Sequence, residues 1–371
     1  MEGPRGARVE ELEEIIKLSN KVFRSTLEGD MGREYPLLFS EKNCENLRII
    51  KEDNKIVSLV GILFSDILIL GNKIKVCMIG SVATDPEYRG RGFATLLMQD
   101  SILKSVQEGA DLMLISGGRG LYRRLGAINA GLYKTFHIDK AKLPKSSLKV
   151  RKVDEGDIPK LLKLMESESV RFLRSYEELK ILLACSMVVN RPGEVLIIED
   201  NDVPLGYVAI QLSRKPEEIP HIKEIGGSRS AIIDSLYSIL EIYKKDSILL
   251  DTLSSDTEIS YILEKLGIRG EDRGFAGTIK IINPKGFIRS LDSYFRRILG
   301  EEYNNFSVEF NPPFTFRFKD ERFFVREEDL PALIFGSIEK KIEIPEYLPM
   351  IKKIFEMLFP IPLVDYGLNY T

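Results

Sequence analysis

The spacing of apolar residues in the first third of the chain changes repeatedly between a helical period and a strand period. An amphipathic helix is predicted over 9–23, and a second helix over 93–108 is stopped by Gly109. Short apolar runs predict strands at 47–50, 56–64, 79–83, 112–116 and 132–138, with a hairpin over 66–76 that turns at Gly71-Asn72. This order indicates an α/β layer built on a mixed sheet.

The later part of the chain gives two further groups of elements. The first group repeats the opening order of strand, acidic turn and helix from Leu148 onward, with strands at 194–199 and 205–213, a helix at 229–243 and a strand from 248. The second group has a helix at 287–299, strands near 306–310, 314–319 and 322–325, and a last helix at 345–357. We therefore expect two related α/β domains and a smaller C-terminal domain.

The stretch between the strand at 79–83 and the helix at 93–108 holds the clearest candidate chemistry. Asp85-Pro86 ends the strand, and Arg89-Gly90-Arg91-Gly92 follows. Two residues without Cβ allow the backbone to turn sharply and to bring its N–H groups close to an anion. A helix N-terminus flanked by two arginines is suited to a diphosphate. In the helix itself, Phe93, Leu96, Leu97, Leu103 and Val106 lie near helical spacing, which predicts one buried face.

The spacing of this loop separates it from other phosphate-binding motifs. It has neither the Gly-x-Gly-x-x-Gly of dinucleotide-binding folds nor the Gly-Lys-Ser/Thr of a phosphate-binding loop. The order Arg89, two residues, Gly92, one residue, Ala94 resembles motif A of the GNAT superfamily of N-acetyltransferases. The resemblance extends to the strand at 112–116 and to a short helix that carries Tyr122, where GNAT enzymes often place a tyrosine that protonates the departing thiolate.

This resemblance implies an acetyl-CoA site, with coenzyme A as the product. The diphosphate would lie on the loop and helix start, and the pantetheine chain would bind the backbone of the preceding strand. The residues implied as cofactor-binding are Val82, Ala83, Thr84, Arg89, Gly90, Arg91, Gly92, Phe93, Ala94 and Thr95. Arg91, Arg123 and Arg124 are candidates for the ribose phosphate.

The whole chain resembles the enhanced intracellular survival (Eis-like) family of acetyltransferases. The implied fold is α/β (α+β), with tandem GNAT-like mixed-sheet domains followed by a sterol-carrier-protein-like α+β domain. The expected domains are a catalytic one over 1–144, a second GNAT-like one over 145–283 and the sterol-carrier-like one over 284–371. The second copy has Gly226-Gly-Ser-Arg-Ser230 at the loop position, which departs from motif A and indicates a degenerate structural copy.

The resemblance implies transfer of acetyl to a primary amine of a small molecule or peptide by direct attack on the thioester. Tyr122 is the candidate acid. His137 and His221 lie at positions that favour structural roles, and the family instead implies that the terminal carboxylate, here that of Thr371, takes the amine proton. It also implies a homo-oligomer. The alternative is a non-catalytic GNAT-fold protein that binds a lipid or other apolar ligand through its C-terminal domain.

Composition indicates which partners and which cell compartment to expect. A net charge of −3, with 44% hydrophobic and 29% charged residues, gives no electrostatic reason to expect nucleic acid as a partner. The chain has no apolar run of the roughly 20 residues needed to cross a bilayer, and its N-terminal segment is charged, so we expect a cytoplasmic protein without a membrane partner. Cys44, Cys77 and Cys185 are scattered, which argues against disulfides and against a metal site.

Overall fold

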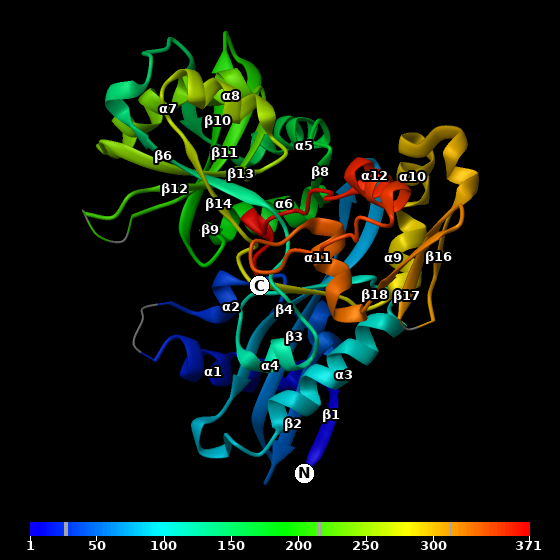
Figure 1. Cartoon of the computed structure of the whole chain (residues 1–371). Coiled ribbons are helices and arrows are strands. Elements are labelled where there is room, and N and C mark those ends of the chain that lie inside the picture. Colours follow the sequence, from blue (N-terminus) through cyan, green and yellow to red (C-terminus); the bar gives the residue numbers. More distant parts are fainter. Residues whose placement is uncertain (26–28, 214, 216, 312) are drawn as a thin grey trace. The chain divides into compact units, whose positions relative to one another are not determined.

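The computed structural model describes residues 1–25, 29–213, 215, 217–311 and 313–371 (Figure 1). It forms two compact units, each assembled from separate stretches of chain. The first unit contains residues 1–131, 276–361 and 371, and the second contains 132–275 and 362–370. Among the described residues, no helix is both long and apolar enough to cross a bilayer.

The first unit is built on a mixed sheet in the order β1-β2-β3-β4-β5-β15. All neighbouring strands in this order are antiparallel except β4 and β5, which are parallel. The strands are β1 (Glu2–Gly6), β2 (Leu47–Glu52), β3 (Lys55–Ile69), β4 (Asn72–Thr84), β5 (Leu112–Ile115) and β15 (Thr278–Ile281). The predicted hairpin is present, but Leu70 and Gly71 have the positive φ angles of the turn, so it lies one residue before the predicted position.

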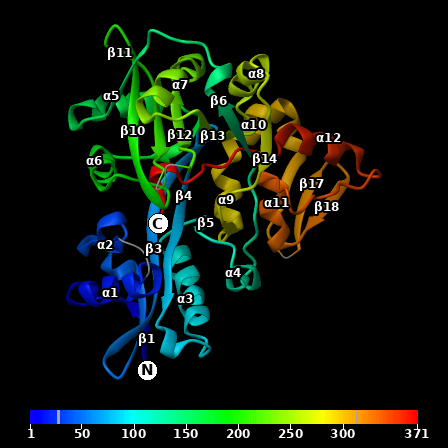
Figure 2. The same ribbon diagram turned by 90° about the vertical axis from the view of Figure 1, so that its left-hand side faces the viewer.

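Helices cover both faces of this sheet, and Figure 2 shows α1 and α3 on opposite sides of its strands. The helices are α1 (Leu12–Phe23), α2 (Met31–Glu34), α3 (Phe93–Gln107) and α4 (Gly120–Arg124). The face of α3 was predicted only in part. Phe93 and Leu97 are buried as expected, but Leu96, Leu103 and Val106 are 40%, 65% and 40% exposed. The face toward the sheet continues instead through Met98 and the small residues Ser101 and Ser105, which are buried and let the helix lie close to the strands.

One strand of each sheet comes from a part of the sequence that we expected to belong to the other domain. The strand predicted at 132–138 forms β6 (Tyr133–Asp139), which pairs with β13 and β14 in the second unit. β15, which follows the second unit's last strand in sequence, pairs with β5 in the first unit. Buried side chains hold each of these two strands: Phe136 and Ile138 in the second core, and Ile279 and Ile281 in the first. The units therefore do not follow the expected boundaries at residues 144 and 283.

The C-terminal part of the first unit has the three expected strands and the closing helix, but the single helix predicted at 287–299 is two helices, and a further short helix precedes the closing one. Its elements are α9 (Pro284–Ser290), α10 (Asp292–Leu299), β16 (Phe306–Glu309), β17 (Phe314–Phe318), β18 (Glu321–Val325), α11 (Leu330–Phe335) and α12 (Pro349–Leu358). The antiparallel sheet β16-β17-β18 packs against α12 through aromatic rings, with Phe316 and Phe355 5.2 Å apart between centroids. α9 packs against β4, and α11 packs against β15. The sterol-carrier-like identity of this part stays a prediction.

The second unit is built on a sheet in the order β14-β6-β13-β12-β11-β10-β7, with β9 paired to β10. Its elements after β6 are β7 (Lys149–Lys152), α5 (Ile158–Glu166), β8 (Val170–Leu173), α6 (Tyr176–Cys185), β9 (Met187–Val188), β10 (Arg191–Asp200), β11 (Val203–Gln211), β12 (His221–Gly227), α7 (Arg229–Tyr243), β13 (Ser247–Leu253), α8 (Thr257–Lys265) and β14 (Gly270–Arg273). The predicted turn at Asn201-Asp202 is confirmed, with both residues at positive φ.

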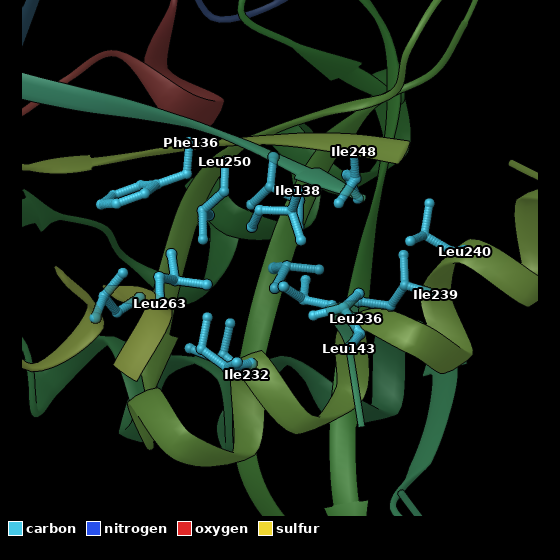
Figure 3. Close-up of a cluster of buried hydrophobic side chains, with 14 of the residues drawn as sticks. Phe136, Ile138, Leu143, Ile232, Leu236, Ile239, Leu240, Ile248, Leu250 and Leu263 are labelled. Atoms are coloured by element: carbon cyan, nitrogen blue, oxygen red, sulfur yellow. The ribbon is translucent and has the colours of Figure 1, made fainter. Parts of the chain in front are cut away.

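One apolar core fills the space between α7 and the second sheet. Figure 3 shows side chains from β6, β13 and α7 gathered in this cluster, among them Phe136, Leu250 and Leu236. Each of these three side chains is at most 1% exposed. An amphipathic helix that packs on a sheet face requires a core of this kind. The helix predicted at 229–243 is confirmed, because α7 begins and ends at these two residues.

Candidate active site

The first unit's sheet opens between its two parallel strands. β4 and β5 pair from Val76 with Leu112 to Ile79 with Ile115, while β4 continues to Thr84. A β-bulge lies at this point, because two residues of β4, Ser81 and Val82, face the single residue Val60 of β3. Ser81 has a φ of +50°. Its hydroxyl forms a hydrogen bond of 2.7 Å with that of Ser19 in α1, which fixes the bulge.

The open strand edge beyond the bulge comprises Val82, Ala83 and Thr84. These residues remain paired to β3, where Leu59 faces Ala83 and Ser58 faces Thr84. On the side toward β5, their backbone has no strand partner within the described part of the chain. Open N–H and C=O groups on a strand edge can bind an extended amide chain.

The glycine loop leads directly from this edge into α3. Gly90 and Gly92 have φ of +80° and +81°, a region that glycine adopts without strain, and a Cβ at either position would point into open space. Gly92 is the N-terminal cap of α3. In the described residues, no hydrogen-bond acceptor is found for the backbone N–H groups of 90–94. The loop therefore presents a row of N–H donors at a helix N-terminus.

The arginines of the loop differ in their partners. Arg91 forms an ion pair with Glu52 of β2, with Nη1 2.6 Å from Oε2, and its guanidinium lies over the ring of Phe93. Arg89 is exposed and pairs with no carboxylate in the described residues, so its charge is available to an anion at the loop. Of the other two candidates for the ribose phosphate, Arg123 pairs with Glu339, with Nη1 3.0 Å from Oε2, and Arg124 has no such partner among the described residues.

Asp85 anchors the start of the loop. Its buried carboxylate accepts hydrogen bonds from Lys21 at 2.9 Å and Lys55 at 2.8 Å, and it also accepts one from the N–H of Glu87. Burial acts to raise the pKa of Asp85, but the two lysines outweigh it and lower the pKa to about 2. The charged carboxylate thus ties α1 and β3 to the turn before the loop.

The carboxylate of Thr371 lies in the opening between β4 and β5. Ser116, the residue after β5, has its Oγ 3.0 Å from a carboxylate oxygen of Thr371 and 3.1 Å from the carbonyl oxygen of Ile79, so its one proton can go to either. On the other strand, a Cβ built at Gly80 would lie only 2.4 Å from the Thr371 carboxyl carbon. The approach thus depends on a glycine at position 80.

Tyr122 lies on α4 and is 4% exposed. Its ring carbon Cε2 is 3.4 Å from the position that a Cβ would take on Gly117, the residue after Ser116. Gly117 is itself held by Thr278 of β15, whose hydroxyl donates to its carbonyl oxygen at 2.9 Å. Two consecutive residues therefore lie next to the proposed base and acid: Ser116 is beside the Thr371 carboxylate, and Gly117 is beside the Tyr122 ring.

Sequence reasoning missed the residues that support this arrangement. Ser116 was predicted only as the end of a strand, and Gly80 carried one signal, a glycine inside an apolar strand, which often marks a close approach of another backbone. The two histidines, for which the sequence predicts structural roles, lie in the second unit, where His221 Nε2 is 2.9 Å from a carboxylate oxygen of Asp251. Within the described residues, no group of His, Cys, Asp and Glu is arranged to hold a metal ion.

Comparison with known proteins finds a family model that matches this part of the chain. The model of the acetyltransferase (GNAT) domain matches residues 4–128, which include the loop, the open edge and Tyr122. No curated protein matches the chain significantly.

Several solved structures share the fold over nearly the whole chain. A GCN5-related N-acetyltransferase from Anabaena variabilis has a TM-score of 0.68 at 15% identity, covering 98% of both chains. A probable N-acyltransferase from Enterococcus faecalis has a TM-score of 0.69 at 14% identity, covering 99% of both. Eis1 from Mycobacterium abscessus has a TM-score of 0.65 at 10% identity, again covering 99% of both chains. The predicted resemblance is thus confirmed: residues 4–128 match the GNAT acetyltransferase domain, in a chain that shares its fold with Eis1 and with GCN5-related N-acetyltransferases.

Proposed function

We propose that this protein is an acetyl-CoA-dependent N-acetyltransferase that transfers acetyl to a primary amine of a small molecule or peptide. The observation that carries the proposal is the Thr371 carboxylate in the opening between β4 and β5, beside Ser116, in the unit that also holds the glycine loop and Tyr122. We further propose that residues 1–144 correspond to the catalytic GNAT domain, 145–283 to a second GNAT-like domain and 284–371 to a sterol-carrier-like one.

Three features of the first unit fit acetyl-CoA. The backbone N–H groups of 90–94, with the N-terminal end of α3, suit its diphosphate. Arg89 adds an exposed positive charge there. The open edge at Val82, Ala83 and Thr84 suits the amides of its pantetheine chain. The N-terminal turn of α3, with Phe93, Ala94 and Thr95, completes this proposed cofactor site, together with Gly90, Arg91 and Gly92.

The chemistry needs an uncharged amine and a good leaving group. The Thr371 carboxylate is proposed to take one proton from the ammonium form of the acceptor, and the lone pair of the resulting neutral amine then attacks the thioester carbon. As the new C–N bond forms and the C–S bond breaks, Tyr122 donates its phenolic proton to the departing sulfur. The attacking nitrogen, now positively charged, gives its excess proton to the Tyr122 phenolate, and the proton taken up by Thr371 passes to water. Ser116 is a positioning residue, because its hydroxyl can hold the carboxylate in place. Proton transfer by a positioned group typically contributes about 100- to 10,000-fold to rate.

A lipid-binding role for the C-terminal part has less support. Its interior is filled by aromatic side chains packed on one another, with Phe355 5.2 Å from Phe316, 5.6 Å from Phe323 and 5.5 Å from Phe359 between ring centroids. Close-packed rings of this kind stabilise a core and occupy the volume that an apolar ligand would need.

Two variants test the proposed acid and base in a thiol-release assay with acetyl-CoA and a panel of primary amines. Tyr122→Phe should lower kcat by about 100-fold or more and leave the affinity for acetyl-CoA nearly unchanged. Adding one glycine after Thr371 moves the carboxylate away from Ser116 and should lower kcat to a similar extent.

The matched control is Thr371→Ser, which keeps both the carboxylate and a hydroxyl at this position and should keep its kcat. Full activity in the extended protein would remove the terminal carboxylate from the mechanism, and full activity in Tyr122→Phe would remove the acid.

A further inference from the structure

The second unit has an opening of its own between parallel strands. β12 and β13 pair only through His221 with Leu249 and Ile222 with Leu250, and their following residues separate. A cavity of about 100 Å³ lies at this point. It is lined by charged and polar side chains from several elements of the unit, including Arg171, Lys223, Glu224, Asp251, Thr252 and Arg273.

The helix N-terminus beside this cavity is already occupied by a protein carboxylate. Glu168 accepts a hydrogen bond from the N–H of Gly227 at 2.8 Å, just before α7. It also forms a two-pronged ion pair with Arg229, the first residue of α7, at 2.6 Å for each prong. Because Glu168 fills the place where a diphosphate would meet the helix, a second molecule of coenzyme A is excluded here.

Two of the carboxylates that line the cavity, those of Glu224 and Asp251, are satisfied by the protein. Glu224 accepts from Arg174 at 2.5 and 2.9 Å, from the hydroxyl of Tyr207 at 2.9 Å and from the N–H of Leu368 at 2.9 Å. Asp251 accepts from the hydroxyl of Thr135 and from Lys223, both at 2.6 Å, and forms an ion pair with Arg273 at 2.9 Å. These two acceptors therefore have little capacity left for a ligand cation.

Hydrogen-bond donors, by contrast, are left over. Arg171 donates to the carbonyl oxygen of Glu168 but has no carboxylate partner in the described residues. Neither Nε of Arg273 nor the hydroxyl of Thr252, which are both buried, has a hydrogen-bond partner there. Thr252 is 6% exposed and lines the cavity. Buried polar atoms without partners are uncommon in folded proteins, and here two of them, with Arg171, line one cavity.

From this excess of donors we propose that the cavity binds a small ligand through an oxyanion, a carboxylate or a phosphate. Arg171, Arg273 and Thr252 would be its contacts. The volume has room for only a few heavy atoms, since one water molecule needs about 10 to 15 Å³ on this measure. A short-chain organic acid or a phosphate ion fits, and a nucleotide does not. The site is independent of the proposed transferase activity.

The test is calorimetric titration of the full chain with succinate and, separately, with inorganic phosphate. We expect saturable one-to-one binding of at least one of them, and the one that binds identifies the oxyanion. Arg171→Gln should weaken this binding by at least about tenfold, since a charge-assisted hydrogen bond is lost. Thr252→Val, which removes the hydroxyl and keeps the shape, should weaken it as well.

Two control variants test whether the loss of binding is specific to this cavity. Arg269→Gln makes the same charge change on an exposed side chain of the same unit that does not line the cavity, and should bind as the unchanged protein does. Binding should also persist in Gly92→Glu, which separates this site from the cofactor site of the first unit. The proposal is overturned if neither ligand binds at concentrations up to about 10 mM, a limit of very weak affinity, or if Arg171→Gln and Thr252→Val both bind with unchanged affinity.

Discussion

At the scale of single residues, the site depends on small side chains at points of close approach. Gly80 has no Cβ on the strand edge that the Thr371 carboxyl group approaches, and the Ser116 hydroxyl holds a carboxylate oxygen at 3.0 Å. Both residues lie at the point where β4 and β5 stop pairing. The position of the proposed base is therefore set by two residues that would not themselves exchange protons with the substrate.

Replacing Gly80 by alanine tests this arrangement. The new Cβ would lie 2.4 Å from the Thr371 carboxyl carbon, so the C-terminal residue must move. Misplacement of a reacting group by about 1 Å can cost about 100-fold in rate, and we expect a loss of that size in kcat. The affinity for acetyl-CoA should change little, because the glycine loop is untouched.

Gly118→Ala is the control for this variant, because it makes the same substitution two residues after Ser116, where a Cβ would meet open space. It should be as active as the unchanged protein. If Gly80→Ala were equally active, the close approach would have no role in catalysis.

Asp85 makes the stability of the first unit depend on pH. Its pKa is lowered from 3.8 to about 2 in the folded protein. Between these values the unfolded chain binds the proton more readily, so this contribution is fully present near neutral pH and is lost as the pH falls from about 5 to 2. Asp85→Asn should therefore lower the free energy of unfolding by about 1 to 2 kcal/mol at pH 7 and by less at pH 3.

Urea unfolding at the two pH values measures this difference. Glu87→Gln, a similar change of charge on an exposed neighbour, should have little effect at either pH. An equal loss of stability at pH 7 and pH 3 in Asp85→Asn would show that the carboxylate charge is not what stabilises the loop.

At the scale of elements, local patterns predicted the helices and strands well but not their partners. Glycine, proline and apolar spacing are local signals, and they placed α7, the turn at Asn201-Asp202 and the loop before α3. No local signal in the sequence shows that β6 pairs in the sheet of the second unit and β15 in the sheet of the first unit, because an apolar strand fits the edge of either sheet. The place of Thr371 beside Ser116, 255 residues away in sequence, was implied only by the family resemblance.

The pairing of β15 with β5 and of β6 with β13 predicts which amides lose protection from hydrogen exchange when either strand is weakened. Ile279→Ala in β15 removes a fully buried side chain, which typically costs about 2 to 5 kcal/mol, and should speed exchange of the amides of β5 in the first unit. Phe136→Ala in β6 should instead speed exchange in β13 of the second unit.

Peptide-resolved exchange monitored by mass spectrometry can follow both strands in one experiment. Loss of protection in β13 alone after Ile279→Ala would contradict the pairing of β15 with β5.

At the scale of the whole molecule, each unit is discontinuous in sequence. The chain leaves the first unit after Gly131, returns at Ala276, leaves again after Ile361 and contributes Thr371 at the end. A cut at one place therefore cannot separate two intact units, and a fragment ending at residue 144 would lack β15, the neighbour of β5. The proposed catalytic domain is thus a functional region that depends on later parts of the chain.

The central claim is that the loop before α3 holds the diphosphate of acetyl-CoA, and calorimetric titration with acetyl-CoA tests it most directly. Gly92→Glu places a side chain and a negative charge among the N–H groups at the start of α3. Gly109→Glu is the matched control at the other end of the helix, because both glycines have φ near +80° and open space at the Cβ position. We expect binding with a Kd of about 10 μM or lower in the unchanged protein and in Gly109→Glu, and its loss in Gly92→Glu. No binding by the unchanged protein, or equal binding by both variants, would contradict the account.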